Sequence, residues 1–152
     1  HTAYRRQRQM CIRDSGNTEE GAEILEEAFE EAGVDVEVVE ANFADPEDFQ
    51  DYDIVIVGTY TYGPDGNLPE EIVDFYEELE EVDLSGKVFG TFGSGDDFYE
   101  KYCKSVDDFD QQLAQAGANQ GFQPVKYNLI PGQEAINDLN AMAQALIDQA
   151  KN

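Results

Sequence analysis

Two short apolar runs, each followed at once by a loop that carries glycine and tyrosine, constrain the fold of this chain most. The first run is Ile54-Val55-Ile56-Val57, and the loop after it is Gly58-Thr59-Tyr60-Thr61-Tyr62-Gly63. The second run is Val88-Phe89-Gly90-Thr91-Phe92, and the loop after it is Gly93-Ser94-Gly95-Asp96-Asp97-Phe98-Tyr99. Short apolar runs of this kind are typical of strands that are covered on both faces, as in a parallel sheet. Because ligands of open α/β sheets bind beyond the carboxyl ends of the strands, both loops are candidate binding segments.

The rest of the sequence alternates between helical and strand patterns. Apolar residues at helical spacing predict helices over residues 17–32, 69–79, 98–116 and 133–150. Strand patterns cover residues 34–39, 53–58, 87–93 and 122–129, and Pro124 interrupts the last of them, which favours an edge strand. Asp45-Pro46 is expected to open a short turn or helix. The alternation predicts an α/β fold, a doubly wound parallel sheet with helices on both faces, in one domain over residues 1–152.

The N-terminal segment departs from this pattern. All four arginines of the chain lie within its first 13 residues, where the first strand of the sheet should stand. A central parallel strand is usually rich in valine and isoleucine, and burying unpaired charges there costs several kcal/mol each. We interpret residues 1–14 as foreign to the rest of the chain. Our preferred explanation is translated adapter sequence from the end of an assembled read.

Composition excludes several classes of function. The chain has 9 basic and 34 acidic residues, a net charge of −25, which argues against nucleic acid or an anionic membrane as a partner. No apolar run approaches the roughly 18 residues of a membrane span, and we expect no secretory signal. The single histidine, His1, argues against a catalytic triad or a histidine zinc site, and we expect no metal. Cys11 and Cys103 form no disulfide or metal pattern, so we expect a reducing cytoplasm and a buried Cys103 on a helix.

A third segment completes the candidate site. Ser15-Gly16-Asn17-Thr18 opens the first predicted helix, where hydroxyls and backbone N–H groups can hold a phosphate. The alternative role of this segment is an ordinary helix cap. The tyrosines of the two strand-end loops can cover a flat aromatic ring. A phosphate at one end and a planar ring at the other predict flavin mononucleotide (FMN).

Together these segments resemble the short-chain flavodoxins, the FMN-dependent electron carriers of bacteria. The resemblance covers about residues 15–150 and rests on three motifs in order: Ser15-Gly16-Asn17-Thr18-Glu19-Glu20, Thr61-Tyr62-Gly63, and Gly93-Ser94-Gly95-Asp96 with Tyr99-Glu100 and Cys103. It implies a flavodoxin-like, five-stranded parallel sheet of order 2-1-3-4-5 and one non-covalently bound FMN. The chain departs from the family at Arg13, since the family has a hydroxyl residue two positions before Ser15.

The resemblance also implies roles for individual residues. The segment from Ser15 to Thr18 would hold the phosphate, and Thr61 resembles the hydroxyl that reaches it. Tyr62 and Tyr99 occupy the positions that flank the flavin ring. Asp96 and the backbone from Ser94 to Tyr99 should meet its pyrimidine edge, while Tyr60 and Phe98 could simply shield the ring. The expected FMN-binding residues are Ser15, Gly16, Asn17, Thr18, Thr59, Tyr60, Thr61, Tyr62, Gly63, Gly93, Ser94, Gly95, Asp96, Phe98 and Tyr99.

The implied function is that of a low-potential, one-electron carrier, not an enzyme. It would act as a monomer that shuttles electrons between basic redox partner proteins, which are reductases and electron acceptors. The acids from Asp65 to Asp83 would then form a rim that steers such partners, although they could also be an ordinary solvated helix face. One alternative is an FMN-dependent NAD(P)H or quinone reductase on the same fold, which needs a substrate pocket above the flavin. A signalling receiver domain is a further alternative, but Gly58-Thr59 stands where its phosphorylatable aspartate should be.

Overall fold

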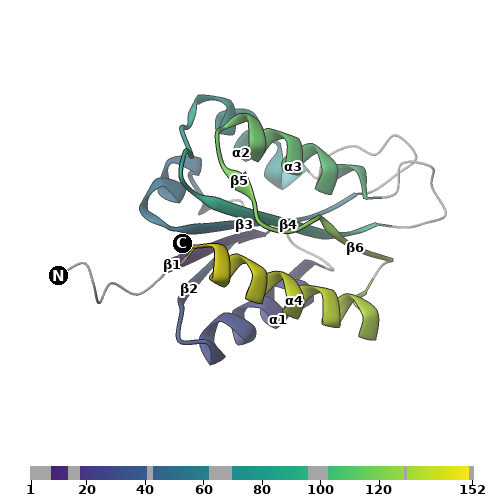
Figure 1. The fold of residues 1–152 in the computed structure, drawn as a ribbon. Helices are drawn as coiled ribbons and strands as arrows, with labels where there is room; N and C mark the ends of the chain where they lie inside the picture. Colours follow the sequence, from purple (N-terminus) through teal and green to yellow (C-terminus); the bar gives the residue numbers. More distant parts are fainter. Residues whose placement is uncertain are drawn as a thin grey trace.

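The computed structural model describes residues 8–13, 18–40, 43–61, 70–95, 103–128 and 130–150, and of residues 8–13, 70 and 71 the backbone alone. These residues form an alternating series of strands and helices (Figure 1). In chain order the elements are β1 (Arg8–Arg13), α1 (Thr18–Glu31), β2 (Asp35–Glu40), η3 (Pro46–Asp51), β3 (Ile54–Tyr60), α2 (Glu70–Glu78), η4 (Leu79–Glu81), β4 (Val88–Gly95), α3 (Lys104–Gln115), β5 (Asn119–Gln120), β6 (Val125–Asn128) and α4 (Gln133–Ala150).

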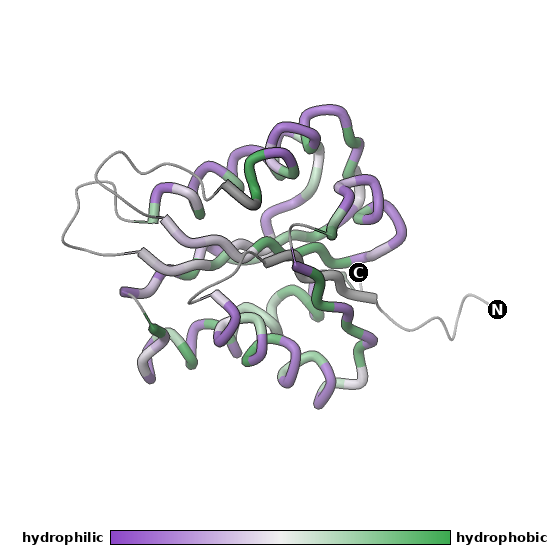
Figure 2. The backbone as a smooth tube through the Cα atoms, turned by 180° about the vertical axis from the view of Figure 1, so that it is seen from behind, coloured by the Kyte–Doolittle hydropathy of each residue, from purple (hydrophilic) through white to green (hydrophobic). Residues whose placement is uncertain are grey.

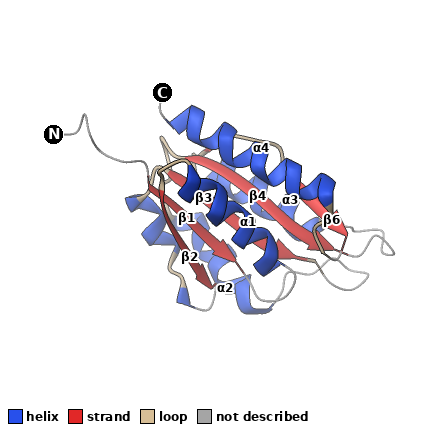
Figure 3. Ribbon diagram, turned by 90° about the horizontal axis from the view of Figure 1, so that it is seen from below, coloured by secondary structure: helices blue, strands red, loops and turns tan. Residues whose placement is uncertain are grey.

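The strands form one sheet of order β2-β1-β3-β4, with β5 and β6 both paired to the far side of β4. Every pairing is parallel, and in Figure 3 the strand arrows point the same way. The predicted order 2-1-3-4-5 is therefore confirmed, with the fifth position divided between two short strands. The division falls before Val125, because Pro124 has no N–H for the ladder. The predicted edge position is confirmed, but this strand position begins at Asn119 rather than at residue 122.

Helices cover the sheet on both faces, α1 and α4 on one and α2 and α3 on the other (Figure 1). A hydrophobic core lies on each face of the sheet, and successive side chains of β3 point alternately into the two. Ile54 and Ile56 pack toward α1 and α4, while Val55 and Val57 pack toward α2 and α3. All four side chains are fully buried. Figure 2 shows apolar residues concentrated on the strands between the layers, while much of the helical layers is hydrophilic. The continuous apolar run at 54–57 thus reflects burial on both faces.

The first helix forms because its apolar residues recur on one side. Ala22, Leu25 and Phe29 are buried against the sheet, while its glutamates are exposed or partly exposed. Gly33 ends the helix with a φ of 80°, a conformation that glycine adopts without strain. The N–H of Val34 then bonds the carbonyl of Phe29 at 3.0 Å, which satisfies one of the last free carbonyls of the helix.

The arginine-bearing segment supplies the central strand. Residues Arg8–Arg13 form β1, which pairs with β2 on one side and β3 on the other. In this register Arg8 stands opposite Asp35, and Arg13 stands opposite Glu40 and Gly58. The backbone of this segment therefore takes the place of the first strand, although its composition differs from the valine- and isoleucine-rich strand expected there. The foreign origin of residues 1–14 remains a prediction.

The helix predicted over residues 98–116 begins at Lys104 in the structure. Cys103 precedes it with a φ of 53°, in the left-handed region, and a helix cannot run through such a residue. The prediction that Cys103 lies on the helix is therefore wrong, while its predicted burial is confirmed. In the part of the chain that the structure describes, no helix is both long and apolar enough to cross a membrane.

Candidate functional site

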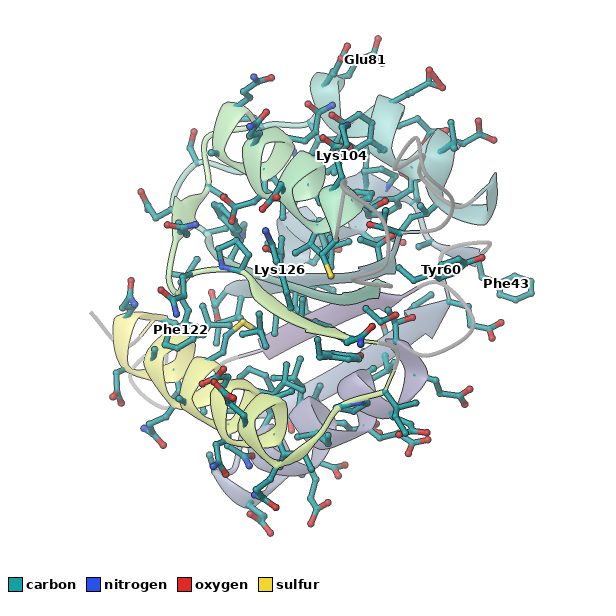
Figure 4. All side chains as sticks on the ribbon, turned by 90° about the vertical axis from the view of Figure 1, so that its right-hand side faces the viewer. Phe43, Tyr60, Glu81, Lys104, Phe122 and Lys126 are labelled. Atoms are coloured by element: carbon teal, nitrogen blue, oxygen red, sulfur yellow. The ribbon has the colours of Figure 1, made fainter. Side chains whose placement is uncertain are left out.

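The carboxyl ends of β1, β3 and β4 lie next to one another, because these strands are parallel neighbours. Figure 4 looks onto this edge of the sheet, with Tyr60 and Lys104 labelled near it. The three predicted binding motifs follow or end these strands. Part of the predicted set lies outside the described residues: Ser15, Gly16, Asn17, Tyr62, Gly63, Asp96, Phe98 and Tyr99. The described part of the edge holds Thr18, Thr59, Tyr60, Thr61, Gly93, Ser94 and Gly95.

Thr18 is the first residue of α1 and has no exposed surface. The N-terminus of a helix carries N–H groups that the helix itself does not use, together with the positive end of the helix dipole. A buried threonine at this point adds a hydroxyl to those donors. This position fits the predicted role of Thr18 in holding a phosphate.

The ends of β3 and β4 approach one another closely. Thr59 pairs with Gly93 and Tyr60 with Ser94 in the parallel register. A Cβ added to Gly93 would overlap the carbonyl oxygen of Thr59 and lie 2.6 Å from Cγ2 of Val106 on α3. Gly93 is therefore required for packing, whatever it contributes to a ligand. Thr59 is fully buried and Tyr60 is half-buried, so Tyr60 supplies aromatic surface at the rim.

Thr61 connects β3 to both β4 and α3. Its backbone N–H donates to the carbonyl of Ser94 at 2.9 Å. Its hydroxyl oxygen accepts from the backbone N–H of Ser105 at 2.8 Å. The structure thus gives Thr61 an acceptor role that the sequence did not indicate, since the prediction for Thr61 was a contact to phosphate.

Cys103 packs beneath the end of β4. Its thiol lies 3.8 Å from the carbonyl oxygen of Gly93 and 3.9 Å from that of Tyr127. A Cβ on Gly95 would lie 2.9 Å from the backbone nitrogen of Cys103. Cys103 and Ser105 were not among the predicted site residues. The signal in the sequence was that Cys103 belongs to the third motif of the resemblance.

The described residues fit the phosphate of FMN. Phosphate is bound by N–H and O–H donors, and this edge offers the start of α1 and the buried hydroxyl of Thr18. The described lysines are engaged elsewhere. Lys104 pairs with Asp108 at 2.9 Å, Lys126 pairs with Asp107 at 2.8 Å, and Lys87 donates to a carbonyl. Among the described residues, the donors at this edge are therefore neutral.

The helix that follows the first aromatic loop carries negative charge. In α2 and η4 the acidic residues with described side chains are Asp74, Glu77, Glu78, Glu80 and Glu81. Tyr76 on the same helix packs edge-on against Phe109, with ring centroids 5.0 Å apart. Burial, followed by the charge of Asp108, raises the pKa of Tyr76 above its ordinary range.

A model of the flavodoxin family matches residues 14–150 of the chain. A curated relative, the probable flavodoxin 2 of Bacillus subtilis, is 42% identical over 126 residues, which are 82% of this chain and 83% of that protein. Among solved structures, a flavodoxin of Streptococcus pneumoniae TIGR4 superposes with a TM-score of 0.90 at 44% identity, over 93% of this chain and 99% of that one.

A second solved structure is a short-chain flavodoxin associated with a PDU bacterial microcompartment. It superposes with a TM-score of 0.91 at 39% identity and covers 95% of this chain and 99% of that one. The family match, the strand order and the three motifs agree with one another. The chain therefore belongs to the flavodoxin family.

Proposed function

We propose that this protein carries single electrons at low potential between basic redox partner proteins. As a flavodoxin it is an FMN-binding electron carrier. The observation that carries the more specific proposal is the edge where β1, β3 and β4 end together. The phosphate segment and both aromatic loops leave the sheet from these three strands, so one ligand can meet all of them.

Different residues at this edge are proposed to bind different parts of FMN. The segment from Ser15 to Thr18 is proposed to hold the phosphate. Tyr62 and Tyr99 are proposed to cover the two faces of the ring, and Tyr60 to exclude water from its rim. Bound FMN supplies the flavin ring that takes up and releases electrons.

Negative charge is proposed to keep the potential low. Adding an electron places further negative charge in a protein whose net charge is −25. The described acids of α2 and η4 follow one of the ring-binding loops along the chain. Because like charges repel, these acids make uptake of an electron less favourable. Aromatic side chains over the ring act in the same direction, since they replace water that would stabilise the added charge.

The same acids support basic proteins as partners. Two of them, Glu78 and Glu81, line a pocket of about 200 Å³ together with Asp45, which precedes η3, and Glu47 in η3. Lysine or arginine side chains of a partner fit such a surface, and complementary charge accelerates encounter. We propose reductases and electron acceptors with basic surfaces, and a monomer that works in the cytoplasm.

We propose that the protein is not itself an enzyme. A reductase on this fold requires a substrate pocket above the flavin, whereas two tyrosines are proposed to cover both ring faces here. Anaerobic mixing of the FMN-loaded protein with NADPH tests this point. No bleaching of the flavin absorption is expected, and rapid bleaching would favour the reductase.

Flavin titrations test the proposed function. The purified protein is expected to be yellow with about one FMN per chain and to bind riboflavin much more weakly, because riboflavin has no phosphate. Fluorescence quenching measures both dissociation constants. Equal affinities for the two flavins would rule out the phosphate segment, and binding of neither flavin would overturn the function.

A further inference from the structure

Thr61 joins the ends of two strands to the start of a helix. Its N–H reaches the carbonyl of Ser94 on β4, and its hydroxyl oxygen accepts the N–H of Ser105 in the first turn of α3. The exposed fractions are 7% for Thr61, 1% for Ser94 and 0% for Ser105. Water therefore has little access to replace either bond.

The bond to Ser105 replaces a cap that α3 does not make for itself. The first N–H groups of a helix need partners from outside it, and the residue before the helix usually supplies a side-chain acceptor. Here that residue is Cys103, which makes no side-chain cap bond. Thr61 caps the helix instead, from 44 residues earlier in the chain.

The two bonds hold the ends of β3 and β4, from which both ring-binding segments continue. Tyr62 follows Thr61 directly, and Ser94 is the last residue but one of β4, after which the chain continues to Tyr99. We propose that Thr61 is a positioning residue, which sets the spacing of the two loops around the flavin ring and does not bind the phosphate. This inference rests on the proposed function, because it concerns the same FMN.

The two roles of Thr61 predict different results for two flavins. A phosphate ligand matters for FMN and not for riboflavin, which has the same ring without a phosphate. A residue that positions the ring loops matters equally for both. The ratio of the two dissociation constants therefore separates the roles.

Three variants make the test. Thr61→Val removes the hydroxyl acceptor and keeps the branched shape, and Thr61→Ser keeps the hydroxyl. Thr91→Val is the matched control, because Thr91 is also fully buried and its hydroxyl lies 3.4 Å from Asp110 on α3, but it stands within β4 rather than at its end. Each variant and the wild type are titrated with FMN and riboflavin. Visible circular dichroism of the bound flavin reports the ring environment.

Thr61→Val is expected to weaken the binding of FMN and riboflavin by the same factor, about tenfold, since binding must then restore the arrangement that one buried hydrogen bond held. It should also change the visible circular dichroism. In Thr61→Ser and Thr91→Val, the two dissociation constants and the visible circular dichroism should stay close to those of the wild type.

Weaker binding of FMN alone would overturn the inference and make Thr61 a phosphate ligand. Unchanged binding of both flavins, or equal losses in Thr91→Val, would overturn it too. A wild type that binds neither flavin would refute the proposed function itself, which distinguishes that failure from the others.

Discussion

Gly93 lies so close to Thr59 that a methyl group on its Cα would overlap the Thr59 carbonyl oxygen. Gly93→Ser should therefore destabilise the protein by about 3 kcal/mol, because the backbone of β3 cannot move aside cheaply. Urea unfolding measures the loss. Gly132→Ser is the control, since a Cβ on Gly132 meets nothing within 4 Å. Equal midpoints for the two variants would contradict the close approach.

Salt should slow electron transfer to a basic partner, since screening weakens the attraction between opposite surface charges. In stopped-flow measurements with a ferredoxin-type reductase, the rate is expected to fall about tenfold from low to physiological ionic strength. Replacing Glu77, Glu78 and Glu81 by glutamine should flatten this dependence. The same number of neutral substitutions on α4, at Glu134, Asp138 and Asp148, should not. Rates independent of salt in the wild type would leave the acids a role in solubility alone.

The first strand offers a test of the N-terminal segment. Replacing residues 8–13 by a strand rich in valine and isoleucine should raise the free energy of unfolding by several kcal/mol, because β1 is central and parallel. The midpoint of urea unfolding is the measurement. A midpoint that stays the same or falls would show that the arginine-bearing sequence is tolerated at this position.

The turn before β4 predicts a pH dependence. The hydroxyl of Ser85 donates to Asp83 at 2.6 Å and its N–H at 3.0 Å, and these bonds lower the pKa of the Asp83 carboxyl. A lowered pKa in the folded state stabilises the protein above the unfolded pKa, about 3.9. This contribution is lost as the pH falls through the folded pKa.

Ser85→Ala should therefore cost more stability at pH 7 than at pH 3, and Ser85→Thr, which keeps the hydroxyl, should cost less at pH 7. Urea midpoints at the two pH values measure the difference. Since Asp83 is exposed, the effect should be small. An equal cost of Ser85→Ala at both pH values would argue against the hydroxyl as the cause.

The fold was predictable because the buried strands can be identified from short apolar runs in the sequence. Ile54 to Val57 are apolar without a break, a pattern that is typical of a strand covered on both faces. The residues at which helices and strands begin and end were less predictable. Nothing in the sequence around Cys103 marks a left-handed residue, since glycine and asparagine are the usual signals, and α3 therefore starts later than expected.

The site was predictable as three segments but not as a network. Thr61 and Ser105 are far apart in the chain, and the contact between them depends on how α3 packs on the sheet. Short motifs specify which residues face a ligand, and they carry no information about which backbone groups need a partner. The cap supplied by Thr61 could be found only once the three-dimensional arrangement was known.

The two outer edges of the sheet are poor templates for another chain. On one side β2 carries Asp35, Glu37 and Glu40, which would repel a second acidic strand. On the other side β5 and β6 are short, and Pro124 lies between them. Strands that are charged, short or interrupted by proline resist the backbone pairing that seeds aggregates. Both edges of this sheet are therefore protected against edge-to-edge pairing with another copy of the chain.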